Sequence, residues 1–125
     1  MSPEGPLILI VEDDASLGPL MIKVLGREKC HALLAANAAE ARALWSEHRD
    51  QVDLLITDIA LSDGTRGDQL ASEFRKERDS LPIIFASGDV PEIESTADVK
   101  SLTHLMKPFS SIELIGAVRN ALNAV

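Results

Sequence analysis

The chain has 125 residues, and its 20 acidic and 12 basic side chains give a formal net charge of −8 at pH 7. This length suits one domain with one hydrophobic core, so we expect a single domain over residues 1–125 with a core of about 7–122. The acidic balance and the lack of a basic run argue against direct nucleic-acid binding by this segment.

The cysteine content and the hydropathy of the chain also limit where it functions. Cys30 is the one cysteine, which excludes an internal disulfide and favours a reducing compartment. No apolar run approaches the roughly 18 residues that a membrane-spanning helix needs, and residues 1–6 lack the features of a signal peptide. We therefore expect a cytoplasmic protein that makes no membrane contact.

The first half of the chain alternates apolar runs with amphipathic segments. Residues 7–11 lack polar alternation, which predicts a strand buried on both faces, and three acids follow it, Glu12, Asp13 and Asp14. The next segment predicts a helix that Gly26 ends, with its apolar face formed by Leu17, Leu20, Met21, Val24 and Leu25. Residues 31–35 are a weaker strand candidate, and Asn37 has the position of a cap that opens a second helix.

The second half continues the same alternation. Residues 52–57 form another buried run that ends at Asp58, and after a turn-rich loop residues 68–78 predict a helix. Residues 81–86 and 102–106 predict the last two strands, with a weakly predicted helix over 90–98 between them. A capping box, residues 110–113, opens the final helix, whose expected inner face is Ile112, Ile115, Val118, Arg119 and Leu122.

Five short strands alternating with helical segments predict a doubly wound α/β fold, a flavodoxin-like five-stranded parallel sheet with helices on both faces. Ligands bind such sheets beyond the carboxyl ends of the strands. Polar residues follow or end the first, third, fourth and fifth predicted strands, whereas none follows the second. The polar residues are Glu12, Asp13, Asp14, Asp58, Ser87 and Lys107. The pattern therefore predicts one functional site at one edge of the sheet.

The residue types at this edge suit magnesium-assisted phosphoryl transfer. A hard cation prefers oxygen ligands, which Asp13 and Asp58 would provide, and Lys107 would add a point charge. An aspartate is also able to accept a phosphoryl group as a nucleophile, which makes Asp58 the candidate. The hydroxyl of Ser87 and the backbone N–H groups of Ala60 and Gly88 would bind the phosphoryl oxygens.

Glu12-Asp13, Asp58, Ser87 and Lys107-Pro108 stand in an order that resembles the receiver domain of two-component response regulators, over nearly the whole chain. The resemblance implies that Asp58 is the phosphoacceptor and that a phosphohistidine on a sensor histidine kinase or phosphotransfer protein is the donor. It also implies Mg²⁺, or Mn²⁺ in its place, bound by Asp13, Asp58 and the Ala60 carbonyl, with Glu12 acting through water. Such a domain is no enzyme in the usual sense, since it catalyses only its own phosphorylation and dephosphorylation.

The chain departs from the family pattern at two places. Ser62 stands where the family commonly has proline, and the loop over residues 62–67 is one residue longer than the commonest form. His104 stands at the switch position, three residues before the lysine, where the family usually has Tyr or Phe. We hypothesise that His104 swings toward Ser87 and that its charge varies near neutral pH.

Three other interpretations stay open at this stage. The chain is alternatively a receiver segment of a hybrid sensor histidine kinase or of a transcription regulator. A phosphohydrolase or phosphotransferase with an aspartate nucleophile is disfavoured, because such enzymes usually carry a second acid where this chain has Ala60. An interaction module that has lost phosphorylation is disfavoured because all five site positions are filled. A homodimer through the region of residues 90–98 remains open.

Overall fold

The computed structural model describes residues 5–61, 64–87 and 102–123 as a parallel sheet with helices on both faces. The strands lie in the order β2-β1-β3-β4-β5. Their bounds, with those of the helices, are β1 Leu7–Val11, α1 Leu17–Arg27, β2 His31–Ala35, α2 Ala38–His48, β3 Val52–Thr57, α3 Gly67–Glu77, β4 Ile83–Ser87, β5 Leu102–Met106 and α4 Ser111–Asn123. The helix predicted over residues 90–98 lies outside the described residues. The predicted fold class is confirmed.

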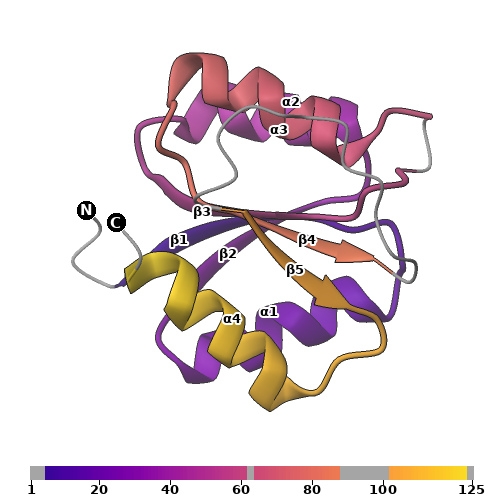
Figure 1. Cartoon of the computed structure of the whole chain (residues 1–125), viewed down its shortest axis with the longest axis vertical. Coiled ribbons are helices and arrows are strands. Elements are labelled where there is room, and N and C mark those ends of the chain that lie inside the picture. The colour runs from indigo at the N-terminus through magenta and orange to yellow at the C-terminus, as the bar shows by residue number, and fades with distance from the viewer. Residues whose placement is uncertain (1–4, 62–63, 88–101, 124–125) are drawn as a thin grey trace.

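The sheet separates two hydrophobic cores. Helices α2 and α3 cover one face, and α1 and α4 cover the other (Figure 1). Side chains alternate between the faces of a strand, so Leu9 and Val11 join the core under α2 and α3, whereas Ile8 and Ile10 join the core under α1 and α4. The absence of polar alternation in the predicted strands therefore reflects burial on both faces.

Two of the helix starts have the side-chain caps that the sequence predicts. The Asn37 side chain accepts a hydrogen bond from the Glu40 N–H at 2.9 Å. At α4 the Ser110 hydroxyl accepts from the Glu113 N–H at 3.1 Å, while the Glu113 carboxylate accepts from the Ser110 N–H at 2.9 Å. These bonds satisfy N–H groups that have no partner inside the helix, which fixes where each helix begins.

Several details of the helix predictions are wrong. Helix α1 continues past Gly26 to Arg27, and Lys29 takes the left-handed conformation after the helix, with φ of 62°. Leu20 in α1 is 54% exposed and Ile112 in α4 is 83% exposed. Arg119, also predicted on the inner face of α4, has a 68% exposed side chain. Of the other predicted residues, Val118 is buried, and Ile115 and Leu122 are partly buried against the core; Leu114 and Ala121 are buried although they were not predicted.

An aromatic pair joins α2 to α3. The rings of Trp45 and Phe74 stack with centroids 4.3 Å apart and planes 8° apart, and both side chains are buried. The indole N–H of Trp45 donates to Glu77 at 2.9 Å, and Glu77 also pairs with Arg49. The hydrogen bonds from Trp45 and Arg49 hold the pKa of Glu77 below its ordinary value of 4.5.

Within the described residues, no helix has the length and apolar character needed to cross a bilayer.

The stacked pair predicts a large loss of stability on truncation. We expect Phe74→Ala to lower the free energy of unfolding by about 3–5 kcal/mol, because it removes a buried ring and leaves a cavity beside Trp45. Ile112→Ala, a control at an exposed apolar residue, should change it by no more than about 0.5 kcal/mol. Urea denaturation measures both values, and equal losses would contradict the assignment of the α4 face.

The ion pair at Glu77 predicts a pH-dependent contribution to stability. A carboxyl whose pKa is lowered by folding stabilises the native state above its ordinary pKa, here 4.5. That contribution is lost as the pH falls through the lowered value. We therefore expect Glu77→Gln to be less stable than wild type at pH 7, with the difference shrinking below pH 4.5.

Urea denaturation between pH 3 and pH 7 measures this difference, roughly spanning the titration of a carboxyl group. Asp50→Asn is the control, since Asp50 is an exposed carboxylate with no ion pair among the described contacts. A Glu77→Gln deficit that is constant over this range would show that the ionised carboxylate does not contribute.

Candidate functional site

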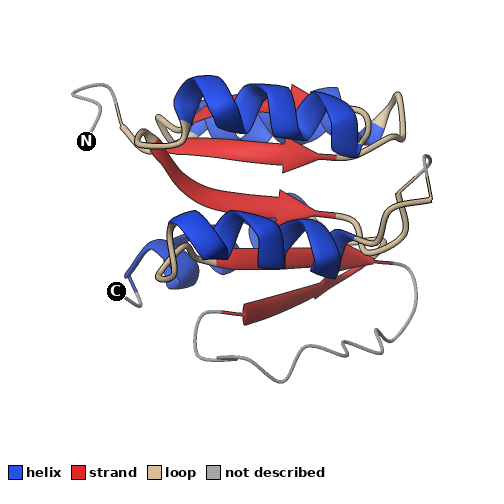
Figure 2. Ribbon diagram, turned by 90° about the horizontal axis from the view of Figure 1, so that it is seen from above, coloured by secondary structure: helices blue, strands red, loops and turns tan. Residues whose placement is uncertain are grey.

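The carboxyl ends of β1, β3, β4 and β5 meet at one edge of the sheet (Figure 2). Backbone hydrogen bonds continue past the last strand residues there. The N–H of Asp58 donates to the Val11 carbonyl at 3.1 Å, and that of Lys107 donates to the Ser87 carbonyl at 2.8 Å. These bonds fix the backbone of the residues that follow the strands, so their side chains start from defined positions.

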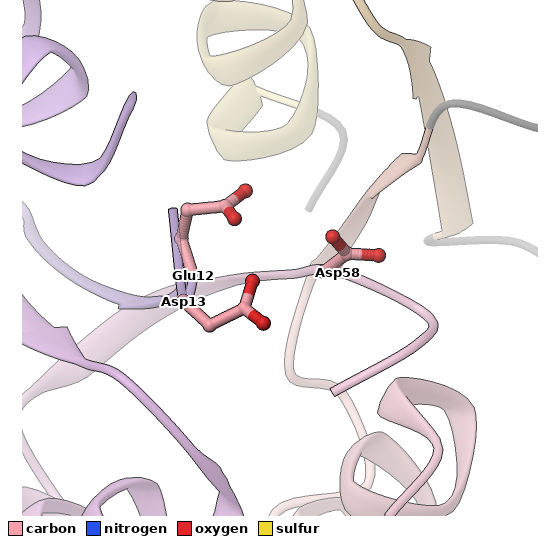
Figure 3. Close-up of side chains that lie close together, drawn as sticks. All are labelled: Glu12, Asp13 and Asp58. Atoms are coloured by element: carbon pink, nitrogen blue, oxygen red, sulfur yellow. The ribbon is translucent and has the colours of Figure 1, made fainter. Parts of the chain in front are cut away.

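Three carboxylates converge at this edge. Glu12 and Asp13 follow β1 and Asp58 follows β3, and one oxygen of each lies within 4.8 Å of the others (Figure 3). Glu12 is buried, Asp58 is half-buried and Asp13 is exposed. Like charges at this separation repel each other unless a cation joins them.

Lys107 supplies a cation to two of these acids. Its Nζ lies 2.7 Å from Glu12 Oε1 and 2.9 Å from Asp58 Oδ2. The sequence predicted a pair with Asp58 but missed the pair with Glu12, because a sequence does not show how far a lysine at the end of β5 reaches across the sheet. Three carboxylates face one ammonium group, so the site keeps an excess of negative charge.

The pKa values of Glu12 and Lys107 reflect their burial and their contact. Burial raises the pKa of Glu12, although hydrogen bonds from Lys107 and from the Asp14 N–H act against the rise. Burial acts to lower the pKa of Lys107, but the hydrogen bonds and charges of Glu12 and Asp58 outweigh it and raise that pKa. Lys107 is therefore a firmly charged ammonium group at the centre of the site.

The carboxylate of Asp14 binds the start of α1 and is not part of this cluster. Its Oδ1 accepts hydrogen bonds from the N–H groups of Ser16 at 2.8 Å and Leu17 at 3.0 Å. These bonds lower the pKa of Asp14 and satisfy N–H groups at the start of α1. Asp14 thus accepts hydrogen bonds at the start of α1, whereas Glu12 and Asp13 belong to the carboxylate cluster.

The remaining predicted site residues are Ala60, Ser87, Gly88 and His104. The Ala60 N–H donates to Asp58 Oδ1 at 3.1 Å, so a donor holds each oxygen of this carboxylate. Ser87 is buried at the end of β4, and Gly88 lies outside the described residues. His104 lies in β5, in register with Phe85. Its Nε2 atom is buried and has no hydrogen-bond partner in the described part of the chain.

The carboxylates suit a hard divalent cation. Magnesium binds oxygen ligands at about 2.1 Å, so two oxygens on one ion lie at most about 4.2 Å apart. The three carboxylates, within 4.8 Å of one another, need only a small approach to share an ion. Their excess negative charge favours the same class of ligand.

Comparison with known proteins agrees with this geometry. A family model described as response regulator receiver domain matches residues 8–119. The chain belongs to this family. The receiver domain is 31% identical over 121 residues to the uncharacterized transcriptional regulatory protein YbdJ of Bacillus subtilis, covering 95% of this chain and 52% of that protein.

Two further relatives differ in how much of their length the receiver domain covers. It is 32% identical to the transcriptional regulatory protein AruR of Pseudomonas aeruginosa, covering 96% of this chain and 50% of AruR. It is 27% identical to sporulation initiation phosphotransferase F of Bacillus subtilis, covering 92% of each chain. The receiver domain thus spans about half the length of YbdJ and AruR.

A crystal structure of a response regulator receiver protein from Sinorhizobium medicae superposes with a TM-score of 0.87, at 28% identity and 98% coverage of both chains. The receiver fold and membership of two-component signalling are therefore established for this chain. The acidic cluster of Glu12, Asp13 and Asp58 is consistent with a phosphoacceptor site.

The contacts of Lys107 predict that it stabilises the metal-free domain. We expect Lys107→Met to lower the free energy of unfolding at pH 7 by about 1–3 kcal/mol, because buried Glu12 loses a charged hydrogen-bond partner. Lys23→Met, at an exposed position of α1, is the matched control and should have little effect. Urea denaturation without divalent cations measures both, and equal stability of the two variants would contradict this role.

Proposed function

We propose that this receiver domain accepts a phosphoryl group on Asp58 from a phosphohistidine of a sensor histidine kinase or a phosphotransfer protein. The observation that carries the proposal is the position of the Asp58 carboxylate. It lies beside two further acids and 2.9 Å from the ammonium of Lys107, at the open edge of the sheet. Phosphoryl transfer needs alignment and charge neutralisation more than covalent chemistry from the protein, and these groups provide both.

In the proposed reaction an Asp58 carboxylate oxygen forms a bond to phosphorus as the phosphorus–nitrogen bond of the donor breaks. The electron pair of that bond stays on the donor imidazole. Lys107 neutralises one phosphoryl oxygen, and the Ser87 hydroxyl with the N–H groups of Ala60 and Gly88 binds the others. Acceptance and later hydrolysis are self-catalysed, so the domain is a phosphoacceptor rather than an enzyme with a separate substrate.

The proposed metal ligands are Asp13, Asp58 and the Ala60 carbonyl, with Glu12 acting through water. Mg²⁺ is the expected ion and Mn²⁺ an alternative, since both prefer oxygen ligands. When bound, the ion neutralises negative charge on the phosphoryl group. In this arrangement Lys107, which already contacts Asp58, would pair with the phosphoryl group.

Ser87 and His104 are the proposed switch residues. The buried Nε2 of His104 has no hydrogen-bond partner among the described residues, so a conformation that brings this atom to a polar partner would satisfy it. Complete reversal of a 1:99 population would need about 5.5 kcal/mol, which contacts to the phosphoryl group would have to supply.

The proposed output is a conformational change that a partner protein or an attached domain recognises. The coverage of YbdJ and AruR, about half of each, supports an attached output domain in a longer protein. The similarity to the receiver domain of the hybrid histidine kinase CckA, with a TM-score of 0.79 at 28% identity, supports the hybrid-kinase alternative equally well.

Intact-mass measurement tests the phosphoacceptor assignment. We expect wild type to gain the mass of one phosphoryl group from a small phosphodonor with Mg²⁺, and Asp58→Asn to gain none. Asp50→Asn, at an exposed position before β3, is the matched control and should behave as wild type.

Two results would count against the proposal. An equal mass gain in Asp58→Asn would place the phosphoryl group elsewhere. Steady phosphate release from many unrelated phosphomonoesters would favour a phosphohydrolase instead.

A further inference from the structure

The loop between Asp58 and α3 is closed by its own backbone. The Gly67 N–H donates to the Ile59 carbonyl at 2.6 Å, and Ala60 pairs with Arg66 in an antiparallel bridge. Further along, the Leu61 N–H donates to the Thr65 carbonyl at 3.2 Å. The two sides of the loop are thus joined, so Ala60 is held by the residues that begin α3.

Gly67 brings the start of α3 directly against the candidate phosphoacceptor. A Cβ atom on Gly67 would lie 1.9 Å from the carbonyl oxygen of Asp58 and 3.1 Å from the Cα of Ile59. Both are backbone atoms, which cannot move aside as a flexible side chain would. Any larger residue at position 67 must therefore displace either the helix or the backbone that carries Asp58 and Ala60.

An ion pair holds the residues on both sides of Gly67. Arg66 Nε and Nη2 donate to the two carboxylate oxygens of Asp68 at 3.0 and 3.2 Å. The Asp68 side chain is only 7% exposed, and its Oδ1 also accepts from the Gln69 N–H at 3.1 Å. Bidentate pairs of this kind fix orientation as well as distance. The pair therefore limits movement of the backbone at Gly67.

We propose that Gly67 and the Arg66–Asp68 pair are positioning residues that fix the Ala60 backbone, and thereby set the affinity of the site for Mg²⁺ and its rate of phosphoryl acceptance. This inference rests on the proposed function, in which the Ala60 carbonyl binds the metal and its N–H binds the phosphoryl group. Gly67 contributes through its backbone, and Arg66 and Asp68 contribute through the ion pair between them. They act through the backbone of the loop.

The test compares Gly67→Ala with Gly116→Ala. Gly116 lies in α4, and an added Cβ there would meet no described atom within 4 Å apart from its chain neighbours and the nearby backbone of its own helix. Calorimetric titration with Mg²⁺ and intact-mass kinetics with a small phosphodonor are carried out at a temperature where circular dichroism shows each variant folded. We expect Gly67→Ala to bind Mg²⁺ about 10- to 100-fold more weakly and to accept the phosphoryl group correspondingly more slowly. Gly116→Ala should match wild type.

Asp68→Asn provides a second route to the same answer if Gly67→Ala does not fold. It keeps the shape of the side chain but removes the charge that holds Arg66, so we expect weaker Mg²⁺ binding in folded protein. A purely structural role would lower the melting temperature and leave the Mg²⁺ affinity of folded protein unchanged. Wild-type affinity and rate in the folded variants would overturn the proposal.

The outcome for wild type separates this inference from the proposed function. Wild type that neither binds Mg²⁺ nor gains a phosphoryl group would defeat the proposed function itself. Wild type that does both, alongside folded Gly67→Ala and Asp68→Asn variants that behave identically, would defeat only the positioning role.

Discussion

The ammonium of Lys107 lies 2.7 Å from Glu12 and 2.9 Å from Asp58, and the rest of the site depends on this pair of contacts. Three carboxylates at one edge of a sheet repel one another unless a cation joins them, and this repulsion is strongest where burial excludes water, as at Glu12. A lysine at the end of β5 provides that cation while leaving the site negative overall. We therefore expect the lysine to stabilise the metal-free domain, while the remaining negative charge favours binding of a divalent cation.

The fold makes this possible because its strands are parallel. Their carboxyl ends lie at the same edge, and the order β2-β1-β3-β4-β5 places β3 between the acids of β1 and the residues that end β4 and β5. The two cores pack against both faces of the strands, so the backbone of the residues just beyond the strands is held in place. The long side chain of Lys107 then reaches from the end of β5 to the carboxylates of Glu12 and Asp58.

The stacked Trp45–Phe74 pair belongs to a different part of the molecule. Helix α3 has 11 residues, so at about 1.5 Å per residue its two ends are about 15 Å apart. Gly67 at its start contacts the backbone of Asp58, whereas Glu77 at its end binds the Trp45 indole. Fluorescence of Trp45 therefore reports on the packing of α2 against α3, and only indirectly on events at the carboxylates.

The sequence alone was sufficient for the fold class, for the strand positions to within two residues, and for the convergence of Glu12, Asp13 and Asp58. These follow from local patterns, since unbroken apolar runs and polar residues at their ends depend little on the rest of the chain. It also predicted the caps of α2 and α4, because such caps involve residues only three positions apart.

Tertiary packing decided the rest. It buried Leu114 and Ala121 of α4 and left Ile112 exposed, which the helical period alone did not predict. It brought the ammonium group of Lys107 to Glu12, and it brought the Cα of Gly67 so close to the Asp58 carbonyl that a Cβ would not fit. Each of these contacts joins segments through space, and their distances depend on how strands and helices are stacked, which no local pattern in the chain encodes.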